Sequence, residues 1–146
     1  MNTSGAVDAL VDFYEHLTPE SVLRFPDFYA PDAYFKDPFN EVRGLASIQR
    51  VFSRMFGQVA EPRFVVVERV VDARGAVLVW EFQYRLRWWG RGRGAVQHMR
   101  GASHLKFDGD AKIVWHRDYW DTAEELYAKL PLIGCLVRGL KKTVAS

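Results

Sequence analysis

The sequence predicts one α+β domain in which helices cover one face of a curved antiparallel sheet. Helical periodicity fills the N-terminal part of the chain, long alternating strands fill the middle, and turn-forming stretches separate those strands. Helices and antiparallel strands that are segregated along the chain are typical of this class. A chain of 146 residues has the size of a single domain, so residues 1–146 are assigned to one unit. A long curved sheet closed by helices forms a cone, whose mouth is a natural ligand site.

Three helices are expected before the sheet begins. Apolar residues recur every three or four positions over residues 6–17 and over residues 45–56, where Gly57 marks the C-terminal end. Thr18, followed by a proline, begins a short second helix between them. Tyr14 lies in the apolar stripe of the first helix, so its hydroxyl is expected to point towards the interior.

The strands follow an irregular connection. Residues 25–33 are interrupted by two prolines and are expected to be irregular, and residues 34–37 form a short extended segment. From Pro62 onward the pattern predicts about four long antiparallel strands joined by turns. The clearest alternation is in AVLVWEFQYRLRWW, which places on one face Leu78, Trp80, Phe82, Tyr84, Leu86 and Trp88.

The C-terminal part of the chain is predicted to be helical and then amphipathic. The DTAE motif at Asp121 has the pattern of a capping box, and it begins a helix that runs to Leu130. Residues 131–146 form a basic amphipathic extension. It rests on a membrane surface, covers the mouth of the cone, joins a dimer or packs on its own domain, and its length favours the last of these.

Composition restricts the classes of partner. The formal net charge is only +2, so no overall field favours a nucleic acid or a membrane. The stretch RLRWWGRGRG is interpreted as a hairpin turn with solvated arginines rather than as a base-stacking surface. Cys135 is the only cysteine, the start of the chain lacks the pattern of a signal peptide, and no apolar run approaches the ~20 residues of a membrane span. A cytoplasmic location without stable membrane insertion is therefore expected.

The order of these elements resembles the NTF2-like superfamily, in particular its SnoaL-like and ketosteroid isomerase-like branches. The resemblance is carried by the stretch YAPDAYFKDP and the final strand HRDYWD, and it covers about residues 6–130. It implies an NTF2-like cone, in which N-terminal helices pack on a curved antiparallel sheet that forms a half-open barrel with an internal pocket. It also implies a homodimer formed through the sheet.

The resemblance assigns roles to several residues. In ketosteroid isomerases the aspartate of the corresponding D-P pair is the general base, which is Asp37 here. A tyrosine of the first helix donates to the oxyanion, which corresponds to Tyr14. The second donor of those enzymes, an aspartate, falls at Ser103, and this departure argues against steroid isomerisation. In the cyclases an acid/base aspartate lies late in the chain, near Asp118 or Asp121.

Strand parity supports an inward Asp37 independently of any family. Phe35 and Asp37 share one face of the extended segment, so a core-facing Phe35 turns the carboxylate inward. Burial there would raise its pKa and suit it to proton transfer. A second possibility is that Asp37 caps the turn made with Pro38 by accepting backbone N–H groups. The sequence leaves both interpretations open.

The last strand carries a second group of candidate site residues. His116, Asp118 and Trp120 alternate on one face, which the resemblance turns inward, and a histidine beside a carboxylate can act as an oriented acid/base pair. The competing interpretation is a structural polar row paired with an arginine such as Arg100. Asp121 is better interpreted as a helix cap.

Metal binding is not expected. His98 and His104 lie on one strand with equal parity, unless Gly101 marks a bulge, and no spacing typical of metal ligands occurs.

Two functions remain open at this level. The first is a cofactor-independent isomerase, cyclase or dehydratase that acts on a small hydrophobic carbonyl compound. Its catalytic residues would be Asp37, Tyr14, His116 and Asp118, and its substrate contacts Ser103, Trp120, Phe35, Trp80, Phe82 and Tyr84. The second is a non-catalytic module that binds a hydrophobic ligand or a partner protein through the same cone.

Overall fold

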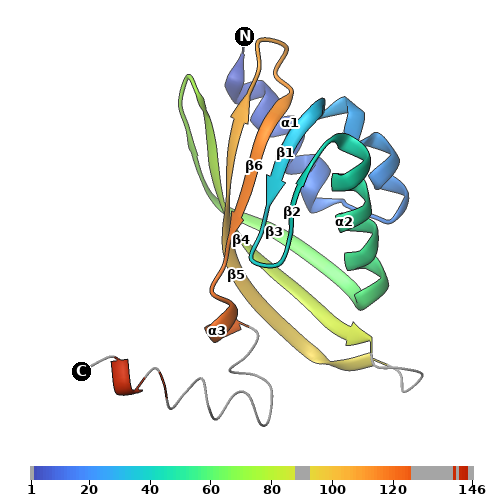
Figure 1. Ribbon diagram of the computed structural model, residues 1–146, viewed down its shortest axis with the longest axis vertical. Helices are drawn as coiled ribbons and strands as arrows, with labels where there is room; N and C mark the ends of the chain where they lie inside the picture. The colour runs from blue at the N-terminus through green and yellow to red at the C-terminus, as the bar shows by residue number, and fades with distance from the viewer. Residues whose placement is uncertain (1, 88–92, 126–139, 141, 145–146) are drawn as a thin grey trace.

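The computed structural model, which describes residues 2–87, 93–125, 140 and 142–144, confirms the α+β class. Its helices are α1 (Thr3–Glu15), the 3-10 helix η1 (Glu20–Asp27), α2 (Leu45–Gln58) and α3 (Thr122–Glu125). Its strands are β1 (Tyr29–Lys36), β2 (Glu41–Arg43), β3 (Val59–Val71), β4 (Gly75–Arg87), β5 (Arg93–Phe107) and β6 (Ile113–Tyr119). Figure 1 shows the long strands β3 to β6 beside the N-terminal helices.

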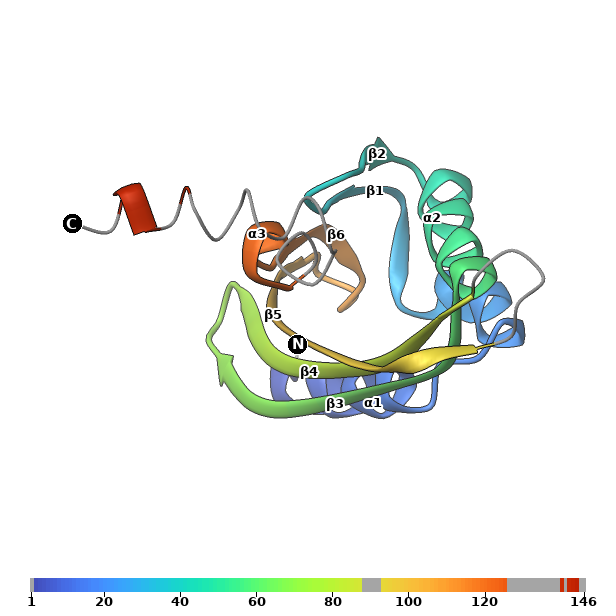
Figure 2. The same cartoon turned by 90° about the horizontal axis from the view of Figure 1, so that it is seen from below.

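The strands form one strongly curved sheet. Its six strands lie in the order β2-β1-β6-β5-β4-β3. Neighbouring strands are antiparallel except β1 and β6, which run parallel. Figure 2 shows that the sheet curls, so that β3, β4 and β5 form one wall and β1, β2 and α2 lie opposite them. The candidate site lies between these walls.

β1 occupies a stretch for which the sequence pattern predicts irregular chain. It begins at Tyr29 and contains Pro31, which has no N–H to donate to a neighbouring strand. The pairing of β1 with β6 tolerates the proline because its register shifts between Tyr29 and Tyr34. The four long antiparallel strands predicted for the later part of the chain are confirmed as β3 to β6, and the extended segment predicted at residues 34–37 coincides with the end of β1. β1 and β2 add a second wall that joins the sheet through β6.

α2 and β3 join without a loop, which also differs from the prediction. Gly57 lies inside α2 rather than after its end, and Val59 is already extended with φ −120° and ψ 147°. β3 thus begins before Pro62, and a shift of register in its pairing with β4 places this proline in a bulge. Glu61 adopts a positive φ of 53° there.

The alternation predicted for β4 is confirmed within the described residues. The buried side chains of this strand are Ala76, Leu78, Trp80, Phe82 and Tyr84. The first two belong to the core formed with α1, η1 and β1, whereas the last three form a second cluster with Val59. This second cluster lies on the cavity described below, so one face of β4 serves both the core and the candidate site.

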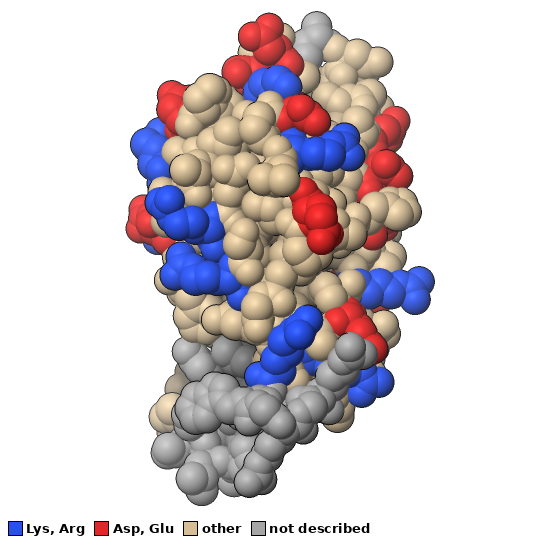
Figure 3. Space-filling model, turned by 90° about the vertical axis from the view of Figure 1, so that its right-hand side faces the viewer, with Lys and Arg blue, Asp and Glu red and all other residues tan. Residues whose placement is uncertain are grey.

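The capping motif at Asp121 is confirmed, because its Oδ1 accepts the N–H of Glu124 at 3.1 Å. The rest of the helix predicted to reach Leu130 lies outside the described residues, as do residues 88–92 and most of the extension 131–146. No described helix is long and apolar enough to cross a membrane. On the face seen in Figure 3, acidic and basic side chains are interspersed with uncharged surface.

Candidate functional site

A cavity of about 490 Å³ is enclosed by residues of α1, α2, β1, β3, β4, β5 and β6. Every residue that the sequence analysis assigned to catalysis or substrate contact lines it: Tyr14, Phe35, Asp37, Trp80, Phe82, Tyr84, Ser103, His116, Asp118 and Trp120. Aromatic and aliphatic side chains make up most of the remaining wall. Mostly apolar walls with a few polar groups are typical of sites for small hydrophobic molecules.

The polar centre of the cavity is a pair formed by His116 and Asp118. Both side chains come from the same face of β6, and His116 Nε2 lies 2.6 Å from Asp118 Oδ1. The imidazole is almost fully buried, with only 3% of its side chain exposed, whereas 19% of the Asp118 side chain is exposed. On its other side, His116 Nδ1 lies 2.8 Å from the hydroxyl of Tyr29, which in turn lies 2.5 Å from the hydroxyl of Tyr14.

Asp118 also accepts a hydrogen bond from a residue of β5. The register of β5 and β6 places Ser103 opposite Asp118, and Ser103 Oγ donates to Asp118 Oδ1 at 2.5 Å. Trp80 Nε1 donates to Ser103 Oγ at 2.9 Å. Gly101 makes room for this contact, since a Cβ built on it would lie 2.4 Å from the Trp80 ring. Ser103 thus connects the indole of β4 to the carboxylate of β6.

The chemistry of these groups sets the direction of the hydrogen bonds. When Asp118 is ionised and the His116 ring is neutral, Nε2–H donates to the carboxylate, which only accepts, and Nδ1 accepts from Tyr29. The Tyr29 oxygen then accepts from Tyr14. Burial raises the pKa of both phenols well above 10, and the charge of Asp118 acts in the same direction, so both stay protonated donors. All donors of the network are therefore directed towards Asp118.

The second oxygen of this carboxylate is free within the described part of the chain. The hydrogen bonds from His116 and Ser103 both go to Oδ1, and no described residue donates to Oδ2. Asp118 lines the cavity. Its Oδ1 is therefore held by two donors, whereas its Oδ2 accepts from none of the described residues.

Asp37 lines the same cavity but is half-buried and engaged in its own turn. Its Oδ1 accepts the N–H of Phe39 at 2.8 Å and that of Asn40 at 2.6 Å. The side-chain amide of Asn40 donates to both carboxylate oxygens, at 3.0 and 3.1 Å. The interpretation of Asp37 as a turn cap is confirmed, and its carboxylate faces four donor contacts rather than an apolar chamber.

His116 is paired with a phenol and a carboxylate and not with an arginine. Its ring nitrogens face Tyr29 and Asp118. Arg100 is paired elsewhere, since its Nε lies 4.0 Å from Glu81 Oε1. The interpretation of His116 as part of a row paired with arginine is therefore wrong for the described residues.

Gly101 is not a bulge, because the β4–β5 register runs without a shift past it. His98 and His104 consequently share a face, as equal parity requires, and His104 packs against Trp115 at a ring distance of 4.9 Å. Within the described ranges, no group of three His, Cys, Asp or Glu side chains is placed to hold a metal ion.

Tyr29 is the main residue that the sequence analysis missed. It is 1% exposed and makes the only hydrogen bond to His116 Nδ1 among the described residues. Strand parity counted back from Phe35 does not find it, because Pro31 is exposed and the β1–β6 register shifts between Tyr29 and Tyr34.

Tyr84, predicted as a ligand contact, carries a further chemical feature. It is 6% exposed, stacks on Phe82 at 5.2 Å, and its hydroxyl makes no hydrogen bond to another described residue. Burial, and to a lesser degree the charge of Glu125, raises its pKa, so the phenol stays protonated. A buried, protonated hydroxyl on the cavity wall can donate to a ligand.

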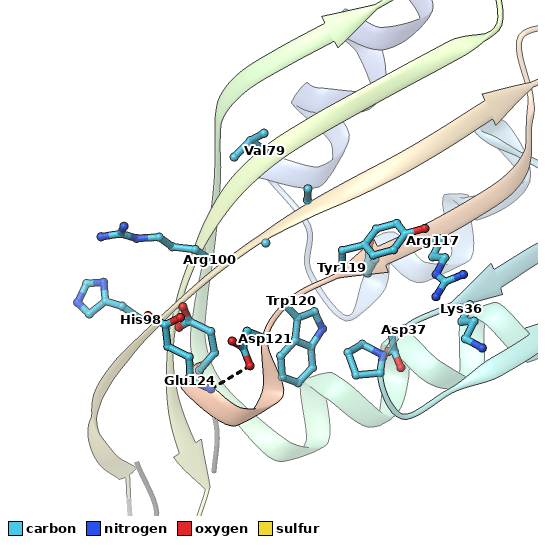
Figure 4. A pocket seen from close by; sticks show the side chains of 15 residues that line it. Lys36, Asp37, Val79, His98, Arg100, Arg117, Tyr119, Trp120, Asp121 and Glu124 are labelled. Atoms are coloured by element: carbon cyan, nitrogen blue, oxygen red, sulfur yellow. Dashed lines mark hydrogen bonds between the residues drawn. The ribbon is translucent and has the colours of Figure 1, made fainter. Parts of the chain in front are cut away.

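An open groove of about 950 Å³ lies on the other side of the cavity wall. Three residues line both the groove and the cavity, namely Asp37, Asp118 and Trp120. Figure 4 shows Trp120 between Asp37 on one side and Asp121 on the other, with the side chains of Lys36 and Arg117 beyond Asp37. The groove and the cavity therefore meet at these three residues, near the end of β6.

Solved structures of low sequence identity share this fold. A Catenulispora acidiphila protein with a ketosteroid isomerase-like fold, solved with trimethylamine, has a TM-score of 0.68 at 14% identity, over 86% of this chain and 92% of that one. A candidate polyketide cyclase from Acidithiobacillus ferrooxidans has a TM-score of 0.66 at 17% identity, over 83% and 91%. An LEH-like epoxide hydrolase of M. tuberculosis has a TM-score of 0.62 at 19% identity, over 96% and 88%.

At these identities the likeness shows the fold and not the activity. No curated protein matches the chain significantly. The family is shown by sequence, since the profile of the SnoaL-like domain matches residues 10–116. The chain therefore belongs to the SnoaL-like family of the NTF2-like superfamily.

Proposed function

We propose that the protein binds a small hydrophobic carbonyl compound in the cavity, and that Asp118 moves a proton from one atom of this compound to another. The observation that carries this proposal is the asymmetry of the carboxylate. Oδ1 accepts two short hydrogen bonds, from His116 and Ser103, whereas Oδ2 receives none from the described residues. A carboxylate that is fixed through one oxygen and open at the other is suited to accept a proton from a bound molecule.

The volume of the cavity and its aromatic lining indicate the class of ligand. A volume of about 490 Å³ lies within the usual range of ~300–1,000 Å³ for small-molecule sites. Along the wall, the ring of Phe64 lies 5.3 Å from that of Trp80 and 6.4 Å from that of Phe82. Such a surface favours an apolar ligand, and a carbonyl group makes a neighbouring C–H bond acidic enough for a carboxylate to break.

In the proposed step, Asp118 Oδ2 accepts a proton from the carbon next to the carbonyl. The electron pair of the broken C–H bond becomes part of an enolate, and the carboxyl group then returns the proton to another atom of the same molecule. No electrons enter or leave, so isomerisation, cyclisation and elimination of water are all accessible to this chemistry without a redox partner. His116 keeps Asp118 oriented through its contact with Oδ1.

Tyr14 takes a supporting role in this proposal. Its hydroxyl is used in the contact with Tyr29, and the chain from Tyr14 through Tyr29 holds His116 Nδ1 as an acceptor. The His116 ring then presents its single N–H to Asp118. The phenols thus act through the imidazole, and the proposed proton carrier is Asp118.

Hydrogen exchange tests the proposal and does not require the natural substrate. The protein is incubated in D₂O with a panel of hydrophobic cyclic ketones, and deuterium next to the carbonyl is followed by mass spectrometry. Catalysed exchange with at least one ketone is expected, and Asp118→Asn should slow it by roughly 10²–10⁴-fold. Exchange that is equally fast with Asp118→Asn would refute the proposed role. Binding of the ketones without any exchange would favour a non-catalytic ligand-binding module.

A further inference from the structure

Asp37 connects the cavity to an exposed aromatic side chain. The residue that follows the D-P pair, Phe39, is 56% exposed, although it is a large hydrophobic residue. Its backbone N–H is one of the donors to Asp37 Oδ1, at 2.8 Å. The backbone N–H of Asp37 also donates to the carbonyl of Asn40 at 2.9 Å, so the turn is closed from both sides. The position of Phe39 is therefore set by the carboxylate of Asp37.

The ring of Phe39 contacts the ring of Trp120. The two rings lie 5.5 Å apart at an angle of 72°, in an edge-to-face contact between the β1–β2 turn and the end of β6. Both rings line the cavity, and Trp120 also lines the open groove. Asp118 lies two residues before Trp120 and lines the same cavity. The Phe39–Trp120 pair is thus the part of the wall nearest the end of β6.

We propose that Asp37 is a positioning residue: its turn cap holds Phe39 against Trp120, and this pair selects ligands with a flat, unsaturated ring system beside Asp118. The inference rests on the proposed ligand site but not on the proton transfer. Aromatic rings bind other π systems through their faces and edges, which favours flat rings over flexible alkyl chains of equal volume. Loss of the cap frees the turn, removes Phe39 from the wall and weakens binding of such ligands.

Two other turns provide matched controls. Asp72 caps the β3–β4 turn by accepting the N–H groups of Arg74 at 2.7 Å and Gly75 at 3.0 Å. Asp108 caps the β5–β6 hairpin in the same way, with Asp110 at 2.9 Å among its donors. Neither aspartate is part of the cavity wall. Substitution of Asp72 therefore removes an equivalent cap without touching the Phe39–Trp120 pair.

The test is a double-mutant cycle with the neutral fluorescent probe N-phenyl-1-naphthylamine. Its Kd is measured for the wild type, Asp37→Ala, Phe39→Ala, the double variant Asp37→Ala/Phe39→Ala, Asp37→Asn and Asp72→Ala. Phe39→Ala and Asp37→Ala should each raise the Kd by roughly twofold to tenfold, the size expected for one lost aromatic contact. The double variant should be no weaker than Phe39→Ala alone, because Asp37 acts through Phe39. Asp37→Asn keeps an acceptor oxygen and should stay close to the wild type, as should Asp72→Ala.

Each other outcome overturns the inference. If the effects of Asp37→Ala and Phe39→Ala multiply, or if either change leaves the Kd unaltered, Asp37 does not act through Phe39. If Asp72→Ala weakens binding as much as Asp37→Ala, the effect is one of general stability. As a second measurement, the backbone amides of Phe39 and Asn40 should exchange faster with solvent in Asp37→Ala and not in Asp37→Asn. The failure of proton transfer is seen separately, as unchanged ketone exchange in Asp118→Asn.

Discussion

His116 and Asp118 form the shortest polar contact between β6 side chains, with Nε2 and Oδ1 separated by 2.6 Å. They are two residues apart on one strand face, so the pleat alone brings both into the cavity. The remaining orientation comes from distant parts of the chain, since Tyr29 and Ser103 lie on β1 and β5. The pair is therefore local in sequence, but its geometry is set by the tertiary fold.

Removal of the Tyr29 hydroxyl should destabilise the protein and release the imidazole. In Tyr29→Phe the buried His116 Nδ1 loses its partner, and the free energy of unfolding should fall by about 1–3 kcal/mol. Chemical denaturation measures this change. In both the wild type and Tyr29→Phe, ¹⁵N NMR of the ring should show the proton on Nε2, because Asp118 still accepts from this nitrogen when the Tyr29 hydroxyl is removed. Tyr34→Phe is the matched control, because its hydroxyl donates to exposed Glu41 at 2.9 Å and should matter much less. Equal losses in both variants would contradict the importance of the network.

The buried phenols predict a loss of stability at high pH. Burial raises the pKa of Tyr14 and Tyr29 in the folded state above their usual value of 10. Below about pH 10 both states keep these protons, and the two phenols add no pH dependence. Above it the unfolded chain loses protons that the folded chain retains, so the free energy of unfolding should fall by up to about 1.4 kcal/mol per pH unit for each tyrosine. A Tyr14→Phe/Tyr29→Phe double variant should show a shallower fall, and an unchanged slope would contradict the burial of the phenols.

Gly101 should tolerate no side chain. A Cβ there would lie 2.4 Å from the Trp80 ring, which would have to move away from Ser103. Gly101→Ala is expected to lower the free energy of unfolding by about 1–3 kcal/mol. Gly57→Ala provides the opposite case, since no atom lies within 4 Å of its Cβ position inside α2, and it should stabilise by about 0.5–1 kcal/mol. Thermal unfolding of both variants tests this contrast, which would be refuted if they shifted in the same direction.

The Tyr84 hydroxyl, which has no hydrogen-bond partner among the described residues, should favour ligands with a polar group. Tyr84→Phe keeps the ring that stacks on Phe82 and removes only the donor. Binding of 2-naphthol should weaken by roughly twofold to tenfold, the size of one hydrogen bond, while binding of naphthalene stays the same. Fluorescence titration of both compounds gives the comparison. Equal changes for the two ligands would show that the hydroxyl makes no contact with them.

The sequence pattern was sufficient to predict which side chains share a face of each strand. Alternation alone placed Trp80, Phe82 and Tyr84 on one side of β4 and His116 and Asp118 on one side of β6, and the cavity lies on both of those sides. Parity is local, because successive side chains of any strand point to opposite faces. Parity therefore grouped these side chains, whereas the inward direction of the β6 group was expected from the resemblance to the NTF2-like superfamily.

Pairing between distant segments was not predictable in the same way. β1 is parallel to β6 and carries a proline at a shifted register, so neither its length nor its partner has a local signal, and Tyr29 was missed with it. For Asp37 the face was predictable, but the hydrogen-bond donors to its carboxylate were not. Parity correctly turned it towards the cavity, but the donors that occupy its carboxylate come from the geometry of the turn. Only the structure distinguishes this engaged carboxylate from that of Asp118.

The central claim is that Asp118, and not Asp37, carries the proton, and one comparison tests it most directly. The rate of deuterium exchange into a bound hydrophobic ketone is measured in D₂O for the wild type, Asp118→Asn and Asp37→Asn under identical conditions. Asp118→Asn should lose roughly 10²–10⁴-fold in rate, as expected for removal of a positioned base, while Asp37→Asn should stay within about tenfold of the wild type. Loss of exchange in Asp37→Asn together with retention in Asp118→Asn would contradict it.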